Sequence, residues 1–409
     1  MGSQIGVAVV GIGGYGQIYL EPLIQDSLAD VNVKLIAAVD PRAEDCRLHP
    51  FLVDRDVPVF ASLDAMYEAG VVPDLVVLAS PLHLHAEQAV RAMESGSHVL
   101  CEKPLAASPS DAARMICARD ATGQMLSVGF QWSFSPVIRR LKADLSAGRF
   151  GRAVSMRTKV YWPRARTYYT RNGWAGRLQT SDGRKVFDSP VNNACAHFLH
   201  NMLDLLGDSP TTADWPAEML AETYRANRIE NYDTAVFRCT THRDVELFAA
   251  VSHVTERLVD PQFEYVFEHG RIISDASTDG RLIAIDADGQ RIDYGSQPTG
   301  SDLDKFWSTV ESIRTGEPPA CSAESAMAHI ALTTAVQKSG RLVNFGDDDI
   351  RPTADGRGVY VPGLEADLDR CYASRRLPSE LGLAWGRPGR PVRMPKFETL
   401  SNPADAAVA

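Results

Sequence analysis

The sequence has no run of about 18 apolar residues, the length that crosses a bilayer, so we expect no membrane-spanning segment. Basic residues are too few for a broad cationic surface, since 42 Lys and Arg stand against 52 Asp and Glu. We therefore expect neither nucleic acid nor a membrane surface as a partner.

Cysteine is scarce and odd in number, with seven among 409 residues. This pattern favours free thiols in a reducing compartment over a disulfide framework. The start, Met1-Gly2-Ser3-Gln4, has no basic stretch before its apolar segment, so we expect no leader peptide and a cytoplasmic location. The whole chain is 44% hydrophobic and 23% charged, which is typical of a globular protein with large cores.

The first 130 residues alternate short apolar runs with helical patterns such as 15–26 and 85–95. Continuous apolar strands separated by helices predict a parallel sheet covered on both faces, which is a doubly wound Rossmann arrangement. The expected strands are 5–10, 34–39, 74–79, 98–101 and 125–129.

The pattern changes after Gly151, where short alternating strands separated by turn residues predict a large, mostly antiparallel sheet in an α+β domain. One amphipathic helix is expected over 191–206, and two more over 302–315 and 322–339. The expected strands are 153–161, 232–240, 244–253, 263–268, 271–276, 281–285 and 290–294. The predicted domains are 1–130, 131–350 and a partly irregular extension over 351–409, whose last ten or so residues we expect to be disordered.

A glycine fingerprint, G-x-G-x-x-G, directly follows the first expected strand. Its glycines allow a tight turn and close approach to a pyrophosphate, which the next helix N-terminus also attracts. Asp40 ends the second strand, where an acid can bind the adenosine ribose and repel a 2′-phosphate, so NAD is favoured over NADP. Arg42 could tolerate a phosphate or be a solvated loop charge. The expected contacts from the fingerprint are Gly11, Ile12, Gly13, Gly14, Tyr15 and Gly16.

Two further segments follow expected strands, Ser80-Pro81-Leu82-His83-Leu84-His85 and Cys101-Glu102-Lys103-Pro104. Read with GIGGYG, VDPR and VGFQWSFSP, they make the chain resemble the Gfo/Idh/MocA family, the glucose–fructose oxidoreductase and inositol dehydrogenase group. The resemblance implies an NAD-dependent dehydrogenase acting on CH–OH groups. It also implies cofactor contacts from Ser80, Pro81, His85, Glu102, Lys103 and Gln131, although His85 could simply start the next helix.

Lys103 is the principal acid/base that the resemblance implies. A hydride cannot leave a carbinol carbon unless the hydroxyl proton departs, and a lysine beside an oxidised nicotinamide would have a lowered pKa. The alternative is an ion pair between Lys103 and Glu102. The family's Asp-x-x-x-His element falls on Asn193 and His197, which departs from the pattern because Asn193 cannot take a proton.

The expected helix over 191–206 places Asn193, His197, His200 and Asp204 along one side. This stripe could face the site, be solvated, or, with Asp188, hold zinc; we expect no metal because no cysteine pair has ligand spacing. The aromatic and arginine-rich segment 161–177 fits a sugar or polyol site or a subunit interface, and its arginines could bind a carboxylate or phosphate. The candidate substrate contacts are Trp162, Arg164, Tyr169, Trp174, Asp188 and His200.

The sequence thus predicts hydride transfer between nicotinamide C4 and a secondary hydroxyl or ketone of a sugar, glycoside or cyclitol. Two alternatives stay open: cleavage of a glycosidic bond through transient oxidation, and a non-catalytic regulator that binds NAD and sugar. Family members pair their second-domain sheets between subunits, so we also expect a homodimer or homotetramer through that sheet.

Overall fold

The computed structural model describes residues 4–25, 32–298 and 303–402. The chain forms two compact units, which are treated separately below. The first comprises residues 1–135, 300–327 and 400–409, and the second residues 136–299 and 328–399. This division differs from the boundaries expected from sequence, because residues 300–327 belong to the first unit. The expected disorder at the chain end falls largely on 403–409, outside the described residues.

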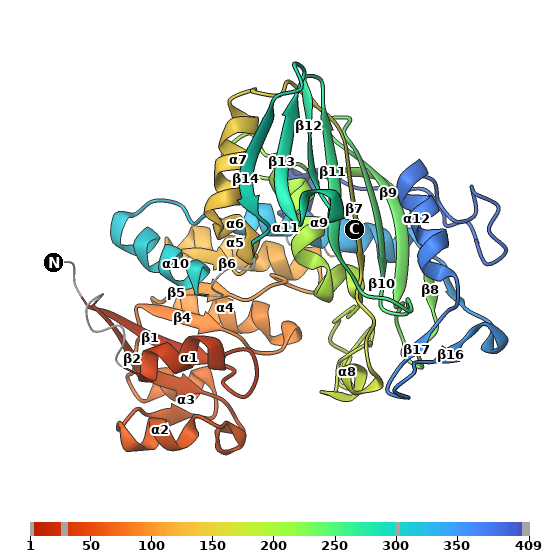
Figure 1. Ribbon diagram of the computed structural model, residues 1–409. Coiled ribbons are helices and arrows are strands. Elements are labelled where there is room, and N and C mark those ends of the chain that lie inside the picture. The colour runs from red at the N-terminus through yellow and green to blue at the C-terminus, as the bar shows by residue number, and fades with distance from the viewer. Residues whose placement is uncertain (1–3, 26–31, 299–302, 403–409) are drawn as a thin grey trace. The chain divides into compact units, whose positions relative to one another are not determined.

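A six-stranded parallel sheet with the order β3-β2-β1-β4-β5-β6 is the core of the first unit (Figure 1). This order is the doubly wound arrangement of dinucleotide-binding folds. The strand interiors are almost wholly buried because both faces are covered, which is why the strands read as continuous apolar runs. The strands are β1 (Ile5–Val10), β2 (Val33–Val39), β3 (Val59–Phe60), β4 (Leu75–Leu78), β5 (His98–Cys101) and β6 (Leu126–Val128).

The helices of this unit follow the strands as the alternation predicted. Strand β3 has only two residues, too few for a periodic pattern, and sequence reasoning missed it. The helices are α1 (Gln17–Ile24), α2 (His49–Asp54), α3 (Leu63–Glu68), α4 (His85–Glu94), α5 (Pro109–Thr122) and α6 (Gln131–Phe134).

Helix α10 (Asp304–Thr315) also belongs to the first unit, although it comes late in the chain. Phe306 and Val310 are buried in the same core cluster as the apolar residues of β1, β2 and β4. Thr309 donates a hydrogen bond from its hydroxyl to Ser127 Oγ on β6, at 2.9 Å. Periodicity identifies such a helix but not the core that it joins.

The second unit is built on a large, mostly antiparallel sheet with the order β14-β13-β12-β11-β7-β10-β9-β8-β15, and β18 pairs with β8. Strand β8 was missed because its residues, PAEMLAETYR, include many helix formers. The strands are β7 (Ala153–Tyr161), β8 (Pro216–Arg225), β9 (Thr234–Thr241), β10 (Glu246–Ser252), β11 (Val259–Phe267), β12 (Gly270–Ser274), β13 (Arg281–Asp286), β14 (Arg291–Ser296), β15 (Leu342–Asn344) and β18 (Val392–Arg393). Strands β16 (Arg351–Pro352) and β17 (Val359–Tyr360) pair separately.

The expected single helix over 191–206 is wrong. A π-helical turn, Pro190–Ala194, precedes helix α9 (Ala196–Asp204), and Cys195 leaves the helical region between them with φ −100° and ψ 7°. The Cys195 amide donates to the carbonyl of Pro190, five residues back, at 2.8 Å. This wider turn changes the helical phase, so spacing across it no longer shows which side chains share a face.

The extension after residue 350 is part of the second unit's core. Helix α12 (Leu364–Ser374) contacts β7 and β10 (Figure 1). Leu364, Leu368 and Leu377 are buried in one cluster with Tyr224 and Phe248 of the sheet. The remaining helices of this unit are α7 (Pro136–Ser146) and α8 (Arg166–Thr170). Two helices contain boundaries between the units: α11 (Ala323–Ser339) at 327/328 and α13 (Phe397–Leu400) at 399/400.

Candidate functional site

The glycine fingerprint forms a tight loop between β1 and α1. Gly11 has a φ of +85°, and a Cβ there would lie 2.6 Å from the backbone nitrogen of Ser80. A Cβ on Gly16 would lie 2.2 Å from the carbonyl oxygen of Gly11. Both positions therefore exclude any side chain for reasons internal to the protein.

Gly13 is different, because a Cβ there would meet only Asp40 Oδ2, at 3.7 Å. Gly13 and Gly14 are exposed, and Gly14 has open space around it. The fold thus does not require glycine at position 13. Close approach of a ligand to the backbone is the role that this glycine has in a dinucleotide-binding fingerprint.

Asp40, at the end of β2, holds this loop in place. Its Oδ2 atom accepts hydrogen bonds from the amides of Ile12 and Gly13 at 3.0 and 3.2 Å, and its Oδ1 atom accepts from the Arg42 amide at 2.9 Å. The carboxylate therefore lies beside the loop where a ribose-binding acid is expected. Arg42 itself is exposed.

The segment after β4 is organised by His85. Its ring nitrogens lie 2.9 Å from the carbonyl oxygen of Pro104 and 3.0 Å from that of Ser80. Burial lowers the pKa of His85, against the opposing effect of these two carbonyls. His85 is buried, so the structure gives it a role in joining the two strand-end segments. Pro81 precedes the 3₁₀ turn Leu82–Leu84, which leads into α4. Gln131 begins α6 and is half-buried.

Glu102 is held by a lysine that sequence reasoning missed. Lys305 on α10 places its Nζ 2.6 Å from Glu102 Oε1 and 2.9 Å from the Tyr15 hydroxyl. Tyr19 also donates to Glu102 Oε1, and the Lys103 amide donates to Oε2 at 3.2 Å. Glu102 is therefore part of a buried cluster with Lys305 and Tyr19, and the cofactor contact expected of it stays a prediction. A charged residue on the apolar side of α10, next to Phe306, was the only signal in the sequence.

In the second unit, Asp188 and Asn193 form a pair. Asn193 Nδ2 donates to Asp188 Oδ1 at 2.8 Å, and the Gly176 amide donates to Asp188 Oδ2 at 2.6 Å. Phe187, just before Asp188, has a φ of +45°, which is strained for a bulky residue. A carboxylate only accepts hydrogen bonds, so the Asn193 nitrogen must face Asp188 and its carbonyl oxygen must point elsewhere.

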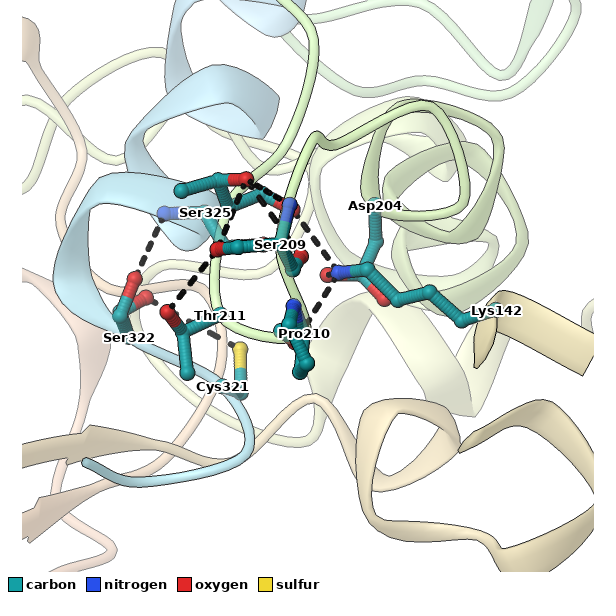
Figure 2. A network of polar contacts seen from close by, with 9 residues as sticks. Lys142, Asp204, Ser209, Pro210, Thr211, Cys321, Ser322 and Ser325 are labelled. Carbon is teal, nitrogen blue, oxygen red and sulfur yellow. Dashed lines mark hydrogen bonds and ion pairs between the residues drawn. The ribbon is translucent and has the colours of Figure 1, made fainter. Parts of the chain in front are cut away.

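The expected stripe of Asn193, His197, His200 and Asp204 is divided by burial, since the first two are half-buried and the last two are buried. His200 is completely buried, so the structure does not support it as a substrate contact. Asp204 Oδ1 accepts from Lys142 Nζ at 2.9 Å in a buried ion pair, and Lys142 also donates to the carbonyl of Pro210 at 3.1 Å (Figure 2). The π-helical turn shifts Asn193 relative to the three residues on α9. Asp204 pairs with Lys142 of α7, a partner that spacing along the sequence cannot reveal.

His197 is the second residue of α9 and is half-buried. Its ring centroid lies 6.5 Å from that of Phe198, whose ring packs edge-on against Trp162 at 5.5 Å. Trp162 also donates from Nε1 to Asp260 at 3.1 Å. The aromatic segment therefore lies beside His197 in the same unit.

Tyr169 and His253 lie deeper in this cluster. The Tyr169 hydroxyl is 3.0 Å from His253 Nδ1, and sequence reasoning did not single out His253. Burial, and then the charges of Arg164 and Arg171, hold the pKa of His253 well below 6.5. Burial, and then the charge of Asp188, raises the pKa of the neighbouring Tyr168 to about 12. Both groups are therefore neutral near pH 7.

Within residues 4–25, 32–298 and 303–402, no group of three or more His, Cys, Asp or Glu side chains could hold a metal ion. In the same residues, no helix has both the length and the apolar character that a bilayer crossing requires.

Comparison with known proteins places residues 5–130 in a family described as the oxidoreductase family with an NAD-binding Rossmann fold (GFO_IDH_MocA). The chain is 26% identical over 213 residues to a 2,7-anhydro-N-acetylneuraminate hydratase of Escherichia coli, covering 51% of each chain. It is 35% identical over 149 residues to an inositol 2-dehydrogenase of Saccharopolyspora erythraea, covering 36% of this chain and 42% of that one. The chain thus spans about half the length of these curated relatives.

Among solved structures, the fold matches the WlbA dehydrogenase of Bordetella pertussis in complex with NADH and UDP-GlcNAcA. The TM-score is 0.65 at 23% identity, and the match covers 82% of this chain and 95% of the other. A levoglucosan dehydrogenase in complex with NADH gives a TM-score of 0.67 at 15% identity, with 82% and 96% covered. At these identities the likeness shows the fold, and it extends through both units.

Proposed function

Since the chain belongs to the Gfo/Idh/MocA oxidoreductase family through its residues 5–130, we propose that it transfers a hydride between nicotinamide C4 of NAD(H) and a secondary hydroxyl or ketone. The substrate class that we propose is a sugar, glycoside or cyclitol. The inositol 2-dehydrogenase relative supports a polyol, and the sugar-linked names of the other relatives support a carbohydrate.

Gly13 is the observation that carries the cofactor assignment. Its missing side chain is explained by ligand approach, because the protein itself leaves room for a Cβ. Asp40 lies against the same loop, and its negative charge favours the ribose diol of NAD over the 2′-phosphate of NADP. When bound, the nicotinamide supplies the hydride acceptor or donor.

We assign the proton transfer to Lys103, which follows β5 at the carboxyl edge of the parallel sheet, where such sheets bind ligands. Its backbone amide is fixed by Glu102. His197 assists in this proposal, and the Asn193 carbonyl oxygen accepts the hydrogen bond of a substrate hydroxyl. Asp188 would then be a positioning residue, since it holds the amide nitrogen of Asn193.

A second candidate is favoured by one relative, which is named a hydratase. In that case water is added or removed and the dinucleotide is regenerated, so no NADH accumulates. Product formation with net NADH supports the dehydrogenase, and product formation without net NADH supports the second candidate. Binding of NADH with no turnover of any sugar or polyol would leave a non-catalytic regulator.

The cofactor site is tested by Gly13→Ala. We expect NADH to bind about tenfold more weakly or worse, because the added methyl group occupies space that the pyrophosphate needs. The thermal midpoint without NADH should not change. Gly173→Ala is the matched control, since its Cβ also enters open space but lies in the second unit. Unchanged NADH affinity in Gly13→Ala contradicts the assignment.

The acid/base role is tested by Lys103→Ala. We expect turnover of a polyol or sugar to fall by about 10² or more, the scale of general acid/base catalysis, with the NADH dissociation constant unchanged. A rate near that of the wild-type protein would remove Lys103 from the reaction.

A further inference from the structure

The arginines of segment 161–177 lack carboxylate partners. Within the described residues, no Asp or Glu oxygen lies within 4.0 Å of Arg164, Arg166, Arg171 or Arg177. This contrasts with arginines on the sheet of the same unit, such as Arg157, which pairs with Glu264, and Arg238, which pairs with Glu380 at 2.8 Å. Carboxylates are in excess in this chain, so the positive charge of the segment is not due to a shortage of acid.

Two of these arginines are fixed around one ring. The Cζ atoms of Arg164 and Arg171 lie 4.9 and 3.7 Å from the centroid of Tyr168. Arg164 also stacks on Trp162, and Arg171 on Trp174, each at 5.4 Å. Stacking immobilises a guanidinium group through its face while its N–H groups lie in the plane. Arg171 is exposed and donates from Nη1 to the carbonyl of Tyr168, which leaves its other N–H groups for a ligand.

Two buried nitrogen atoms in this cluster lack hydrogen-bond partners. Arg164 Nε and His253 Nε2 are both buried, and neither has a hydrogen-bond partner among the described residues. A buried charged donor without an acceptor is costly. His253 cannot balance the positive charge of Arg164, because its ring is neutral. Asp188 is engaged by Gly176 and Asn193 instead.

The cluster also adjoins the residues to which we assign the chemistry. Arg164 stacks on Trp162, Trp162 packs against Phe198, and Phe198 follows His197 at the start of α9. All four lie in the second unit. A ligand group held by the arginines would therefore belong to a molecule that reaches His197.

We propose that Arg164 and Arg171 form an oxyanion subsite, so that the substrate is a sugar derivative bearing a carboxylate or a phosphate group. This inference rests on the proposed function for its statement that the ligand is the substrate. Paired N–H donors on a planar cation match the oxygens of either group, and charge-assisted hydrogen bonds of this kind are stronger than neutral ones. Arg166 on α8 has no stacking partner among the described residues, so nothing fixes its guanidinium group and it does not contribute.

The test compares glucose, galactose and mannose with the uronic acid and the 6-phosphate of each, by calorimetric titration of the full chain saturated with NADH. At least one anionic probe should bind about tenfold or more tightly than its neutral parent. Arg164→Met and Arg171→Met should weaken that probe by about 10- to 100-fold, with little effect on the neutral sugar. Comparison of the uronic acids with the phosphates identifies which anion is preferred.

Arg166→Met is the matched control, because it removes the same charge from the same segment, and its affinities should equal those of the wild-type protein. Arg164→Lys and Arg171→Lys keep the charge without the planar fork and should give intermediate values, which separates recognition from misfolding. The proposal is overturned if no anionic probe is preferred, or if the preference survives in Arg164→Met and Arg171→Met. Arginine-dependent binding of an anionic probe without any turnover would refute the proposed function but support the subsite. Oxidation of neutral polyols that is unaffected by the Arg164 and Arg171 variants would support the proposed function and refute the subsite.

Discussion

Replacing Lys305 with methionine should destabilise the first unit strongly. The Lys305 side chain is 1% exposed and its ammonium lies 2.6 Å from Glu102, which is 9% exposed. Methionine keeps much of the apolar stem but leaves the Glu102 carboxylate buried without its cation. Breaking a buried pair in this way costs about 3–5 kcal/mol. For a unit of this size, that loss lowers the thermal midpoint by roughly 6–20 °C.

Differential scanning calorimetry measures this change, and the transition of the first unit can be identified because NADH should raise its midpoint. Lys34→Met is the matched control, since Lys34 is exposed on β2 of the same unit, and its midpoint should shift little. The double variant Lys305→Met with Glu102→Gln removes both charges. Its loss of unfolding free energy should therefore be smaller than the sum of the losses in the two single variants. A midpoint change below about 2 °C in Lys305→Met, or simple additivity in the double variant, would refute the reasoning.

Three further predictions address other parts of the chain. Leu368→Ala should lower the free energy of unfolding by about 2–5 kcal/mol in a denaturant titration, because Leu368 is fully buried in the extension. Leu258→Ala, at an exposed side chain, should change it by less than about 0.5 kcal/mol. Equal losses in the two variants would show that the extension is not part of the core. The free energy of unfolding should fall by up to about 1.4 kcal/mol per pH unit below pH 6.5, because His253 binds a proton in the unfolded state but stays neutral when buried. In His253→Gln this dependence on pH should be weaker, and an unchanged dependence would contradict the prediction. Asp40→Asn should shift the ratio of NADP to NAD affinity toward NADP by about tenfold or more in fluorescence titration, and an unchanged ratio would dismiss its ribose role.

Much of the first unit could be predicted because each strand except the two-residue β3 carries its own signal. Strand β1 matches the apolar run from Ile5 to Val10, and the fingerprint follows it directly. Such signals are local, since a buried parallel strand is apolar along its whole length. Lys305 has no comparable signal. It lies about 200 residues from Glu102 in the sequence, and only the packing of α10 brings the two together.

In the second unit, helix propensity failed to predict strand β8, and helical periodicity failed to predict the π-helical turn before α9. Strand β8 contains many residues that favour helices, and it becomes a strand because β9 and β15 pair with it on either side. The helix expected over 191–206 was divided by one hydrogen bond from Cys195 to Pro190. A single extra residue in a turn leaves composition unchanged, so no pattern of apolar residues could have revealed it. The consequence is confined to Asn193, because His197, His200 and Asp204 all lie on α9 after the turn.

Asn193 shows how the same local geometry changes the meaning of a departure from the family pattern. Read along the sequence, an amide has replaced a carboxylate and an acid has been lost. In the structure, Asp188 lies five residues earlier and 2.8 Å away, held by the Gly176 amide and by the strained backbone of Phe187. A carboxylate at position 193 would face that of Asp188 at this distance, and like charges so close cannot both ionise. A carboxylic acid at position 193 would therefore have to stay protonated beside Asp188, whereas the amide donates to Asp188 at any pH. Because the amide nitrogen faces Asp188, the direction of the Asn193 carbonyl oxygen is fixed.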